Sequence, residues 1–331
     1  MGLFSSSATG HAEVPGGSKK TRTHPVRSMP SFDRILVVHN GALGDFIQVW
    51  PSLLALSRFW APTPIFWAGR PAYQHWAEKL MPQASAEDQA AVRTLYSATQ
   101  WPDQLQNTLV VWFGLLHIPV SCVHPQLWPI TGLSENDLTP PRQRYAQALE
   151  QRGIPQAQDW QSVWCSQPPS PCPQTDRRVL IAPGAGNDRK CWPLPRFMAV
   201  ARWLARNGKK PVFLLGPAEL ERGVDVQNFE LTAPSHLSEL QQHLAHAELV
   251  LSNDAGPMHL AAAWQTPTLS IFGPSSARQW APPETVTIAS ARPCRPCTRD
   301  GRIACSDLSC LYDIPVSRVV NRLKTMLTPS L

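Results

Sequence analysis

The chain has 331 residues, enough for about two domains, and 43% of them are hydrophobic. Only 16% are charged, compared with about 25% in an average globular protein, which excludes a disordered acidic or basic regulator. The net charge of +6 comes from two segments, residues 1–30 and 287–303, which each carry half of it. A nucleic-acid-binding protein is expected to carry a basic stripe on its folded body, so this distribution argues against a nucleic-acid partner.

The first segment, residues 1–30, is rich in Ser, Gly, Pro and Lys and contains no apolar core of a secretory signal. We therefore expect a disordered leader there. No later stretch approaches the roughly 18 consecutive apolar residues of a membrane span. These features predict a cytoplasmic protein, in which the eight cysteines stay reduced and do not form a disulfide framework.

From residue 34 onward, short apolar runs alternate with helical patterns. The runs are almost continuously apolar, as strands of a parallel sheet are when both of its faces are covered. A first series of predicted strands covers residues 34–39, 64–68 and 108–113. A second series covers residues 178–182, 211–215, 248–252, 267–272 and 285–289. The helical patterns between strands of the second series cover residues 195–207, 237–247 and 257–264.

A proline-rich segment, residues 167–173, separates the two series and is typical of a linker. The fold class is therefore predicted to be α/β, with two Rossmann-like, doubly wound parallel sheets. We expect the two domains to cover residues 31–165 and 176–312. An amphipathic pattern over 316–327 predicts a closing C-terminal helix within residues 313–331.

The first candidate site is the loop that follows the first predicted strand. It contains Gly41, Ala42, Leu43 and Gly44 and ends at Asp45, where a helix is expected to begin. Ligands of open α/β sheets bind at such strand ends. The loop lacks the glycine spacing of a dinucleotide site and the Gly-Lys-Ser/Thr of a P-loop. Two interpretations of the aspartate stay open: it is a general base for an attacking hydroxyl, or it caps the helix.

A second candidate site follows the strand at 248–252. Asn253 and Asp254 are suited to capping a helix, Gly256 permits a tight turn, and Pro257 is favoured in a first helical turn. A helix N-terminus there would offer free N–H groups to a diphosphate, although a well-capped structural helix fits the pattern equally well. The candidate binding residues are Asp254, Ala255, Gly256, Pro257, Met258 and His259.

Two further strand-end loops carry single charged candidates. Lys190 lies in the glycine-containing loop 183–193, where it either neutralises a phosphate or faces solvent. Glu219 follows Gly216, where it either holds ribose hydroxyls or begins a helix.

Taken together, these segments resemble the heptosyltransferases of glycosyltransferase family 9. The resemblance rests on residues 35–45, 183–193, 216–219 and above all 253–263, and it extends from about residue 34 to 327. It implies a GT-B fold, in which two Rossmann-like domains face a cleft. It also implies an inverting transfer of heptose from ADP-heptose to the lipopolysaccharide inner core, with an acceptor such as Kdo-lipid A.

The resemblance also assigns roles to residues. Asp45 would be the catalytic base, supported by the loop 41–44. Lys190 would stabilise the donor phosphates, Glu219 would lie near the nucleoside, and residues 254–259 would hold the diphosphate. No metal or other cofactor is required if these groups stabilise the leaving group, and contact with the inner-membrane surface is expected to be peripheral.

Four cysteines near the C-terminus form a separate pattern. A structural zinc site is one interpretation of their spacing, and reduced thiols or a redox-labile pair is the other. The four are Cys294, Cys297, Cys305 and Cys310. Four nearby arginines would favour thiolates or contact an anionic acceptor or a membrane surface.

Three alternatives to this function remain open from the sequence. The first is a GT-B transferase that uses another nucleotide sugar or acceptor. The second is a nucleotide-sugar epimerase, which needs no lipid acceptor. The third is a non-catalytic protein that binds a sugar nucleotide and is indifferent to loss of Asp45.

Overall fold

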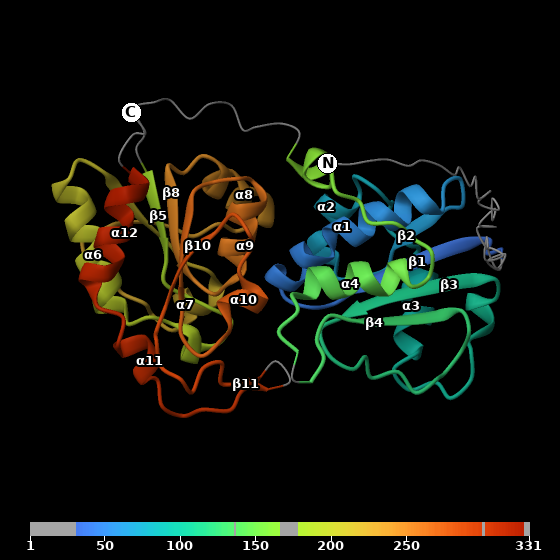
Figure 1. Ribbon diagram of the computed structural model, residues 1–331. Coiled ribbons are helices and arrows are strands. Elements are labelled where there is room, and N and C mark those ends of the chain that lie inside the picture. Colours follow the sequence, from blue (N-terminus) through green and yellow to red (C-terminus); the bar gives the residue numbers. More distant parts are fainter. Residues whose placement is uncertain (1–30, 136, 166–177, 300–301, 328–331) are drawn as a thin grey trace, which may run out of the picture. The chain divides into compact units, whose positions relative to one another are not determined.

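The computed structural model describes residues 31–327, except 136, 166–177 and 300–301 (Figure 1). The described chain from Phe32 onward belongs to one compact unit. The predicted leader, residues 1–30, and the predicted linker, residues 167–173, lie outside the described residues. The domain boundaries therefore stay predictions, although the two series of strands form two separate sheets as expected.

The first sheet has four parallel strands in the order β2-β1-β3-β4. They are β1 (Arg34–His39), β2 (Ile65–Trp67), β3 (Thr108–Gly114) and β4 (Leu127–Thr131). α1 (Leu43–Phe59) and α4 (Pro141–Glu150) pack together, and α3 (Ala86–Thr94) covers the opposite face of the sheet (Figure 1). β1 and β3 are almost wholly buried because helices cover both faces.

The second sheet has six parallel strands in the order β10-β9-β8-β5-β6-β7. They are β5 (Arg178–Ala182), β6 (Lys210–Leu214), β7 (Glu230–Thr232), β8 (Leu249–Asn253), β9 (Thr268–Phe272) and β10 (Val286–Ala289). α6 (Leu194–Arg206) and α12 (Val316–Leu327) lie on one side, and α8 (Leu237–Ala245) and α9 (Gly256–Ala263) lie on the other (Figure 1). β5 and β8 are neighbours, so the loops that follow them emerge at the same edge.

Short elements complete the described chain. The remaining α-helices are α2 (Gln74–Ala77), α5 (Gln161–Trp164), α7 (Pro217–Glu221), α10 (Ala277–Trp280) and α11 (Ser309–Tyr312). Three single-turn 3₁₀ helices cover Pro71–Tyr73, Asp103–Leu105 and Asp188–Lys190. An antiparallel pair is formed by β11 (Thr298–Arg299) and β12 (Arg302–Ile303).

Large aromatic side chains fill the space around α1. Trp50 is fully buried and stacks on Trp164 with 4.9 Å between ring centroids, and Trp76 and Trp160 meet it edge-on. The indole of Trp76 also donates a 2.7 Å hydrogen bond to the Gln241 amide oxygen on α8. Rings of this size contribute much of the buried apolar area, so they hold α1 at a fixed angle.

The predicted strands and helices are present, with ends that shift by one or two residues, and the closing helix spans 316–327 as predicted. Two strands of the parallel sheets, and the short pair β11 and β12, were not predicted. β4 contains Pro129 and β7 has mainly exposed side chains; both lie at a sheet edge, where a strand needs only one partner. Within the described residues, no helix is both long and apolar enough to cross a membrane.

Candidate active site

Asp45 is the third residue of α1, immediately beyond the carboxyl end of β1. Its Oδ2 accepts a 3.2 Å hydrogen bond from the Ala42 N–H, so it caps the helix. Burial raises the pKa of this carboxyl from 3.8 to about 6; the Ala42 N–H and Lys190 oppose the rise, and Asp254 adds to it. The two interpretations from sequence are thus compatible, because one carboxylate caps the helix and has a pKa suited to a general base.

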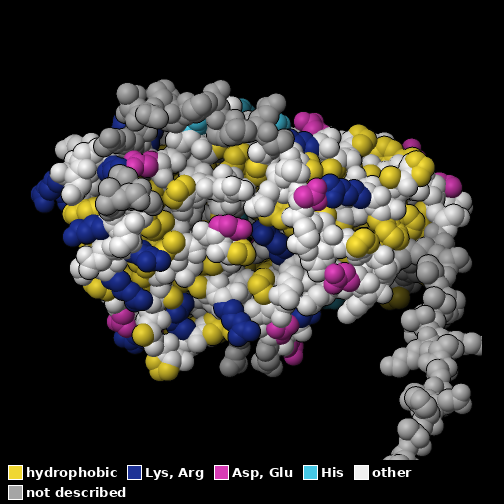
Figure 2. Space-filling model, turned by 45° about the horizontal axis from the view of Figure 1, so that its top comes forward, with side chains coloured by type: hydrophobic (Ala, Val, Ile, Leu, Met, Phe, Trp, Pro, Cys, Tyr) yellow, Lys and Arg dark blue, Asp and Glu magenta, His cyan; other side chains and the backbone are white. Residues whose placement is uncertain are grey.

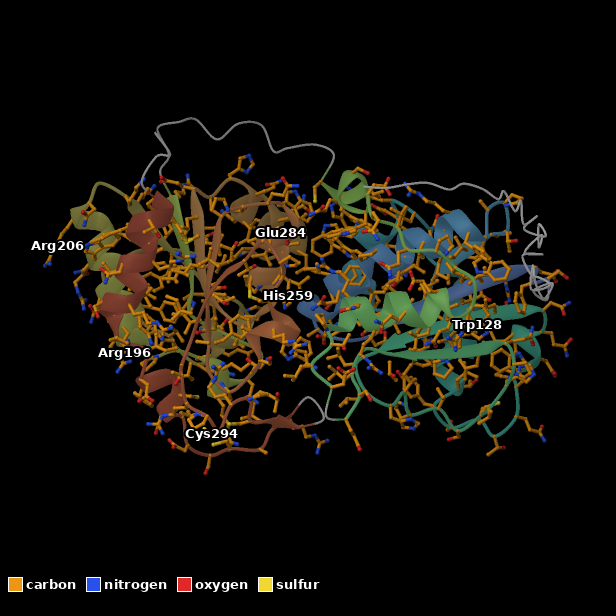
Figure 3. The ribbon with its side chains drawn as sticks, viewed as in Figure 1. Trp128, Arg196, Arg206, His259, Glu284 and Cys294 are labelled. Carbon is orange, nitrogen blue, oxygen red and sulfur yellow. The ribbon has the colours of Figure 1, made fainter. Side chains whose placement is uncertain are left out.

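The N-termini of α1 and α9 meet. A Cβ on Gly44 would lie 2.7 Å from Cδ2 of His259, and a Cβ on Gly256 would lie 3.2 Å from Cβ of Leu43. His259 therefore packs from α9 onto the start of α1 (Figure 3). Two positive helix ends converge at this contact, which is an arrangement that favours an anion.

Lys190 and Asp254 form an ion pair beside this contact. The Lys190 Nζ lies 2.8 Å from Asp254 Oδ2, and the Asp254 side chain is only 4% exposed. The ammonium also lies over the Trp280 ring, 5.6 Å from its centroid. Lys190 is therefore not a solvent-facing loop residue, and the structure brings it together with Asp254 and Asp45, whose pKa both of them influence.

Asn253 joins the two strand-end loops that carry this ion pair. Its Oδ1 accepts a 2.9 Å hydrogen bond from the Trp192 N–H, and its Nδ2 donates one of 2.6 Å to the Pro183 carbonyl. The expectation that Asn253 or Asp254 caps α9 is wrong, because the N-cap is Ala255 and no described side chain caps it. Asn253 instead bridges to the neighbouring loop, which leaves the start of α9 open.

Glu219 lies at the edge of the site. Its Oε2 accepts a 2.9 Å hydrogen bond from the Gly216 N–H at the start of α7, and its carboxylate packs against Gly184. It therefore caps its own helix, as the simpler interpretation held. It also touches the loop that carries Lys190, so a role near a bound nucleoside stays a prediction.

Two buried histidines flank the Asp45 loop. His39 is fully buried, and its Nδ1 lies 3.2 Å from the Phe113 carbonyl oxygen. Because a carbonyl oxygen only accepts, this hydrogen bond requires the proton of the imidazole to be on Nδ1. Burial lowers the pKa of His39 and of His259 to about 4, so both rings are neutral at pH 7. His259 thus contributes packing and a neutral ring rather than a positive charge.

A cavity of about 1,080 Å³ opens beside Lys190. Its other walls come from the loop after β3, from β4 and the loop after it, from α10, and from β11 and the segment before it. Polar or charged wall residues outside Lys190 are His117, Thr131, Ser134, Glu135, Asp137, Gln279 and Thr298. The cavity is large enough for a sugar nucleotide, given that ligand pockets are typically about 300–1,000 Å³. Of the residues predicted from sequence to bind the donor, only Lys190 lines it.

Sequence reasoning missed several of these residues. Trp280 lies under Lys190 and lines the cavity, and Gln279 beside it donates a 3.0 Å hydrogen bond to the Asp137 carbonyl. Asp137 is held by Arg144 at 2.5 Å. The sequence pattern around Trp280, Gln279 and Asp137 gave little indication of a site. α10 is a single turn, and the segment that carries Asp137 has no recognisable motif spacing.

The C-terminal cysteines do not make a metal cluster in the described structure. No group of three or more His, Cys, Asp or Glu among those residues is arranged to hold a metal ion. Cys310 is 3% exposed and belongs to the apolar core, and its thiol interacts electrostatically with Cys294 and Cys305, which lie near Cys297. A structural zinc there stays a prediction that this arrangement does not support.

The arginines beside these cysteines bind the protein itself. Arg295 donates to the carbonyls of Gly273, Ser275 and Ser290, and Arg292 pairs with Asp313. The expectation that they favour thiolates is wrong for Cys297, because burial and the neighbouring thiols raise its pKa to about 11. On the face shown in Figure 2, Lys and Arg side chains are dispersed among acidic and polar groups.

Comparison with known proteins places this site in a family. Residues 132–306 match the model of glycosyltransferase family 9 (heptosyltransferase), which is more than half of the chain. That match includes Lys190, Glu219 and residues 254–259 but begins after Asp45. Lipopolysaccharide heptosyltransferase 3 of Escherichia coli K12 is 32% identical over 116 residues, which cover 32% of this chain and only 34% of that protein.

Solved structures share the fold over nearly the whole chain. A family 9 glycosyltransferase from Veillonella parvula has a TM-score of 0.65 at 19% identity, covering 91% of this chain and 99% of its own. The E. coli ADP-heptose lps heptosyltransferase II has a TM-score of 0.62 at 17% identity, covering 89% and 98%. The predicted GT-B fold is thus confirmed. The chain belongs to glycosyltransferase family 9, the heptosyltransferase family.

Proposed function

We propose that this chain is an inverting heptosyltransferase that moves a heptose from ADP-heptose to a hydroxyl of the lipopolysaccharide inner core. The observation that carries the proposal is the position of Asp45. Its carboxylate, with a pKa near 6, lies where the N-termini of α1 and α9 meet and where Lys190 adds a positive charge. A base and an anion site side by side are what transfer from a nucleotide diphosphate needs.

The reaction follows from these groups. Asp45 accepts the proton of the acceptor hydroxyl as its oxygen attacks the anomeric carbon from the side opposite the diphosphate. The bond from that carbon to the diphosphate oxygen breaks, its electron pair leaves with ADP, and the configuration inverts. The uncapped start of α9 and the Lys190 ammonium stabilise the charge that gathers on the leaving group.

The ion pair between Lys190 and Asp254 is compatible with a donor contact. An ammonium has three donor hydrogens, and Asp254 occupies one of them at 2.8 Å. Lys190 is 24% exposed and lines the cavity of about 1,080 Å³, so its remaining hydrogens can reach a diphosphate oxygen. Asp254 then positions the ammonium, and residues 255–259 supply the helix N-terminus.

The donor and acceptor are inferred from the family. A structural relative is named as an ADP-heptose lps heptosyltransferase, which supports ADP-heptose as the donor and the lipopolysaccharide core, such as Kdo-lipid A, as the acceptor. Because two helix ends and Lys190 already supply positive charge, we propose that transfer requires no metal. Cytoplasmic location and peripheral contact with the inner membrane belong to the same proposal.

The decisive experiment is a product assay on the purified chain with ADP-heptose and Kdo-lipid A, read by mass spectrometry. The expected result is an acceptor heavier by one heptose, with inverted anomeric configuration by NMR. Calorimetric titration with ADP and with UDP should show tighter binding of ADP. Conversion of ADP-heptose into an epimeric sugar nucleotide would indicate an epimerase. Donor binding without product would contradict transfer to Kdo-lipid A and would indicate another acceptor or a non-catalytic binding protein.

A further inference from the structure

A second cavity, separate from the one beside Lys190, lies along α1. It has a volume of about 590 Å³, within the range of small-molecule sites. One face of α1 forms a wall through Gln48, Pro51, Ser52 and Ala55, which recur at helical spacing. Further walls come from α4, residues 154–160 and residues 277–287.

Most of this wall is apolar, but an arginine lies in it. Arg142 of α4 stacks on Trp160, with its guanidinium carbon 4.8 Å from the ring centroid. Its Nε is buried and has no hydrogen-bond partner in the part of the chain that the structure describes, and no ion pair is formed there. Burial lowers the pKa of Arg142, and the electrostatic attraction of Glu284 opposes this shift.

Two hydroxyl groups in the wall also lack a hydrogen-bond partner among the described residues. Ser52 is 2% exposed, and its Oγ has no partner among the described residues; the same holds for the Oγ1 of Thr285. Buried polar groups are normally hydrogen-bonded, because an unmet donor in an apolar setting costs free energy. These two hydroxyl oxygens and the Arg142 Nε are closed off even from water, so a bound group does not reach them in this conformation. The rest of the Arg142 side chain is half-buried and lines the cavity, and an anionic group would offset its charge there.

We propose that this cavity binds a small amphipathic anion, in which a single carboxylate, sulfonate or phosphate meets Arg142 and an aromatic or short acyl body fills the apolar remainder. The anionic end would pair with the terminal N–H groups of the Arg142 guanidinium. The apolar end would pack on Ala146, Leu149 and Pro51. Arg278, exposed at the wall, adds a second positive charge.

The second cavity is lined by other residues than the cavity beside Lys190, although both share α10 and the Arg142 charge also acts on His259. Ala277 and Arg278 face the second cavity, whereas Gln279 and Trp280 face the cavity beside Lys190. Binding in the second cavity needs neither donor nor acceptor, so its test is independent of whether the chain transfers heptose. Competition with ADP tells the two cavities apart.

The test uses anilinonaphthalene sulfonate, an amphipathic anion that fluoresces on transfer to an apolar site, and its uncharged analogue N-phenylnaphthylamine. We expect one saturable site for the sulfonate on the full chain, undiminished by saturating ADP. Arg142→Met should weaken sulfonate binding by about tenfold or more, since it removes a charged hydrogen bond, and should leave the analogue within about twofold.

Arg144→Met is the matched control, because it removes a guanidinium from the same helix that does not line this cavity. It should leave sulfonate binding within about twofold. Ala146→Phe should abolish sulfonate binding, because the new ring fills the cavity. If the Ala146→Phe variant does not fold, Ala55→Leu is used in its place. No saturable binding, equal binding by the Arg142→Met variant, persistence in the filled variant, or full displacement by ADP would each overturn the proposal.

Discussion

His259 lies directly against Gly44, so closely that a Cβ at position 44 would come within 2.7 Å of the imidazole Cδ2. This contact brings a helix of the second sheet onto the helix that presents Asp45. The His259 ring is neutral and the residue is only 4% exposed, so it acts as a rigid spacer between α1 and α9. The spacing between the proposed base and the proposed diphosphate site therefore depends on a glycine that contributes no functional group.

Gly44→Ala should move His259 and disturb that spacing. We expect the free energy of unfolding to fall by about 1–3 kcal/mol, the usual cost of overpacking, and transfer activity to fall with it. Gly186→Ala is the control, because a Cβ there meets nothing within 4 Å, and it should change stability by less than about 0.5 kcal/mol. Urea unfolding of both variants measures this, and equal effects would contradict the argument.

Asp45→Asn should abolish transfer but leave ADP affinity within about twofold, since the proposed role of the carboxylate is towards the acceptor and not the donor. It should also stabilise the chain. The folded-state pKa of about 6 lies above the usual 3.8, so the stabilising contribution of Asp45 is complete below pH 3.8 and is lost as the pH rises through 6. Asparagine keeps the cap and cannot ionise.

The gain in unfolding free energy at pH 8 should be about 1–2 kcal/mol, reduced from the full shift because the carboxylate is partly exposed. It should shrink as the pH falls towards 4. Calorimetry on both proteins at pH 8 and pH 4.5 checks this. A variant that is less stable than the native chain at pH 8 would argue against the raised pKa.

The pH dependence of transfer follows from the same group. Asp45 accepts a proton only when ionised, so kcat/KM should be level above about pH 7 and fall about tenfold per pH unit below about pH 6. His39 and His259 titrate near pH 4 and should not contribute in this range. Initial rates between pH 5 and pH 8 measure the profile, and a rate that rises on acidification would exclude Asp45 as the base.

Removing Lys190 should have two separable effects. Lys190→Ala leaves the buried Asp254 carboxylate unpaired, so we expect a loss of about 1–3 kcal/mol in unfolding free energy and at least tenfold weaker ADP binding. Lys190→Ala combined with Asp254→Ala should recover most of the stability and none of the affinity. Recovery of both would mean that Lys190 only compensates Asp254 and does not contact the donor.

The buried strands were predictable because their apolar runs are continuous, and β1, β5 and β8 lie within a residue or so of the predicted positions. β4 and β7 were not, because Pro129 interrupts the pattern of β4 and the side chains of β7 are mainly exposed. Residue Asp45 was predictable from a strand-loop-helix pattern. Its raised pKa was not, because that depends on burial and on charges far away in sequence.

The roles of Asn253 and Trp280 also lay beyond sequence patterns. Asparagine before a helix is usually a cap, whereas here its amide faces another loop because β5 and β8 are neighbours. Trp280 reaches Lys190 from α10, which is a single helical turn and too short to show helical periodicity in the sequence. In both cases the deciding partner is about 60 to 90 residues away along the chain.

The amide of Asn253 makes the loops after β5 and β8 a single mechanical unit. One side chain accepts from one end of the 183–193 loop and donates to its other end, while its own backbone leads into Asp254. Any displacement of the loop that carries Lys190 is therefore passed to the segment that carries its ion-pair partner. The Lys190 ammonium, which is proposed to meet the donor, and the Asp254 carboxylate that positions it should therefore move together. A substitution in either loop should change the positions of both groups.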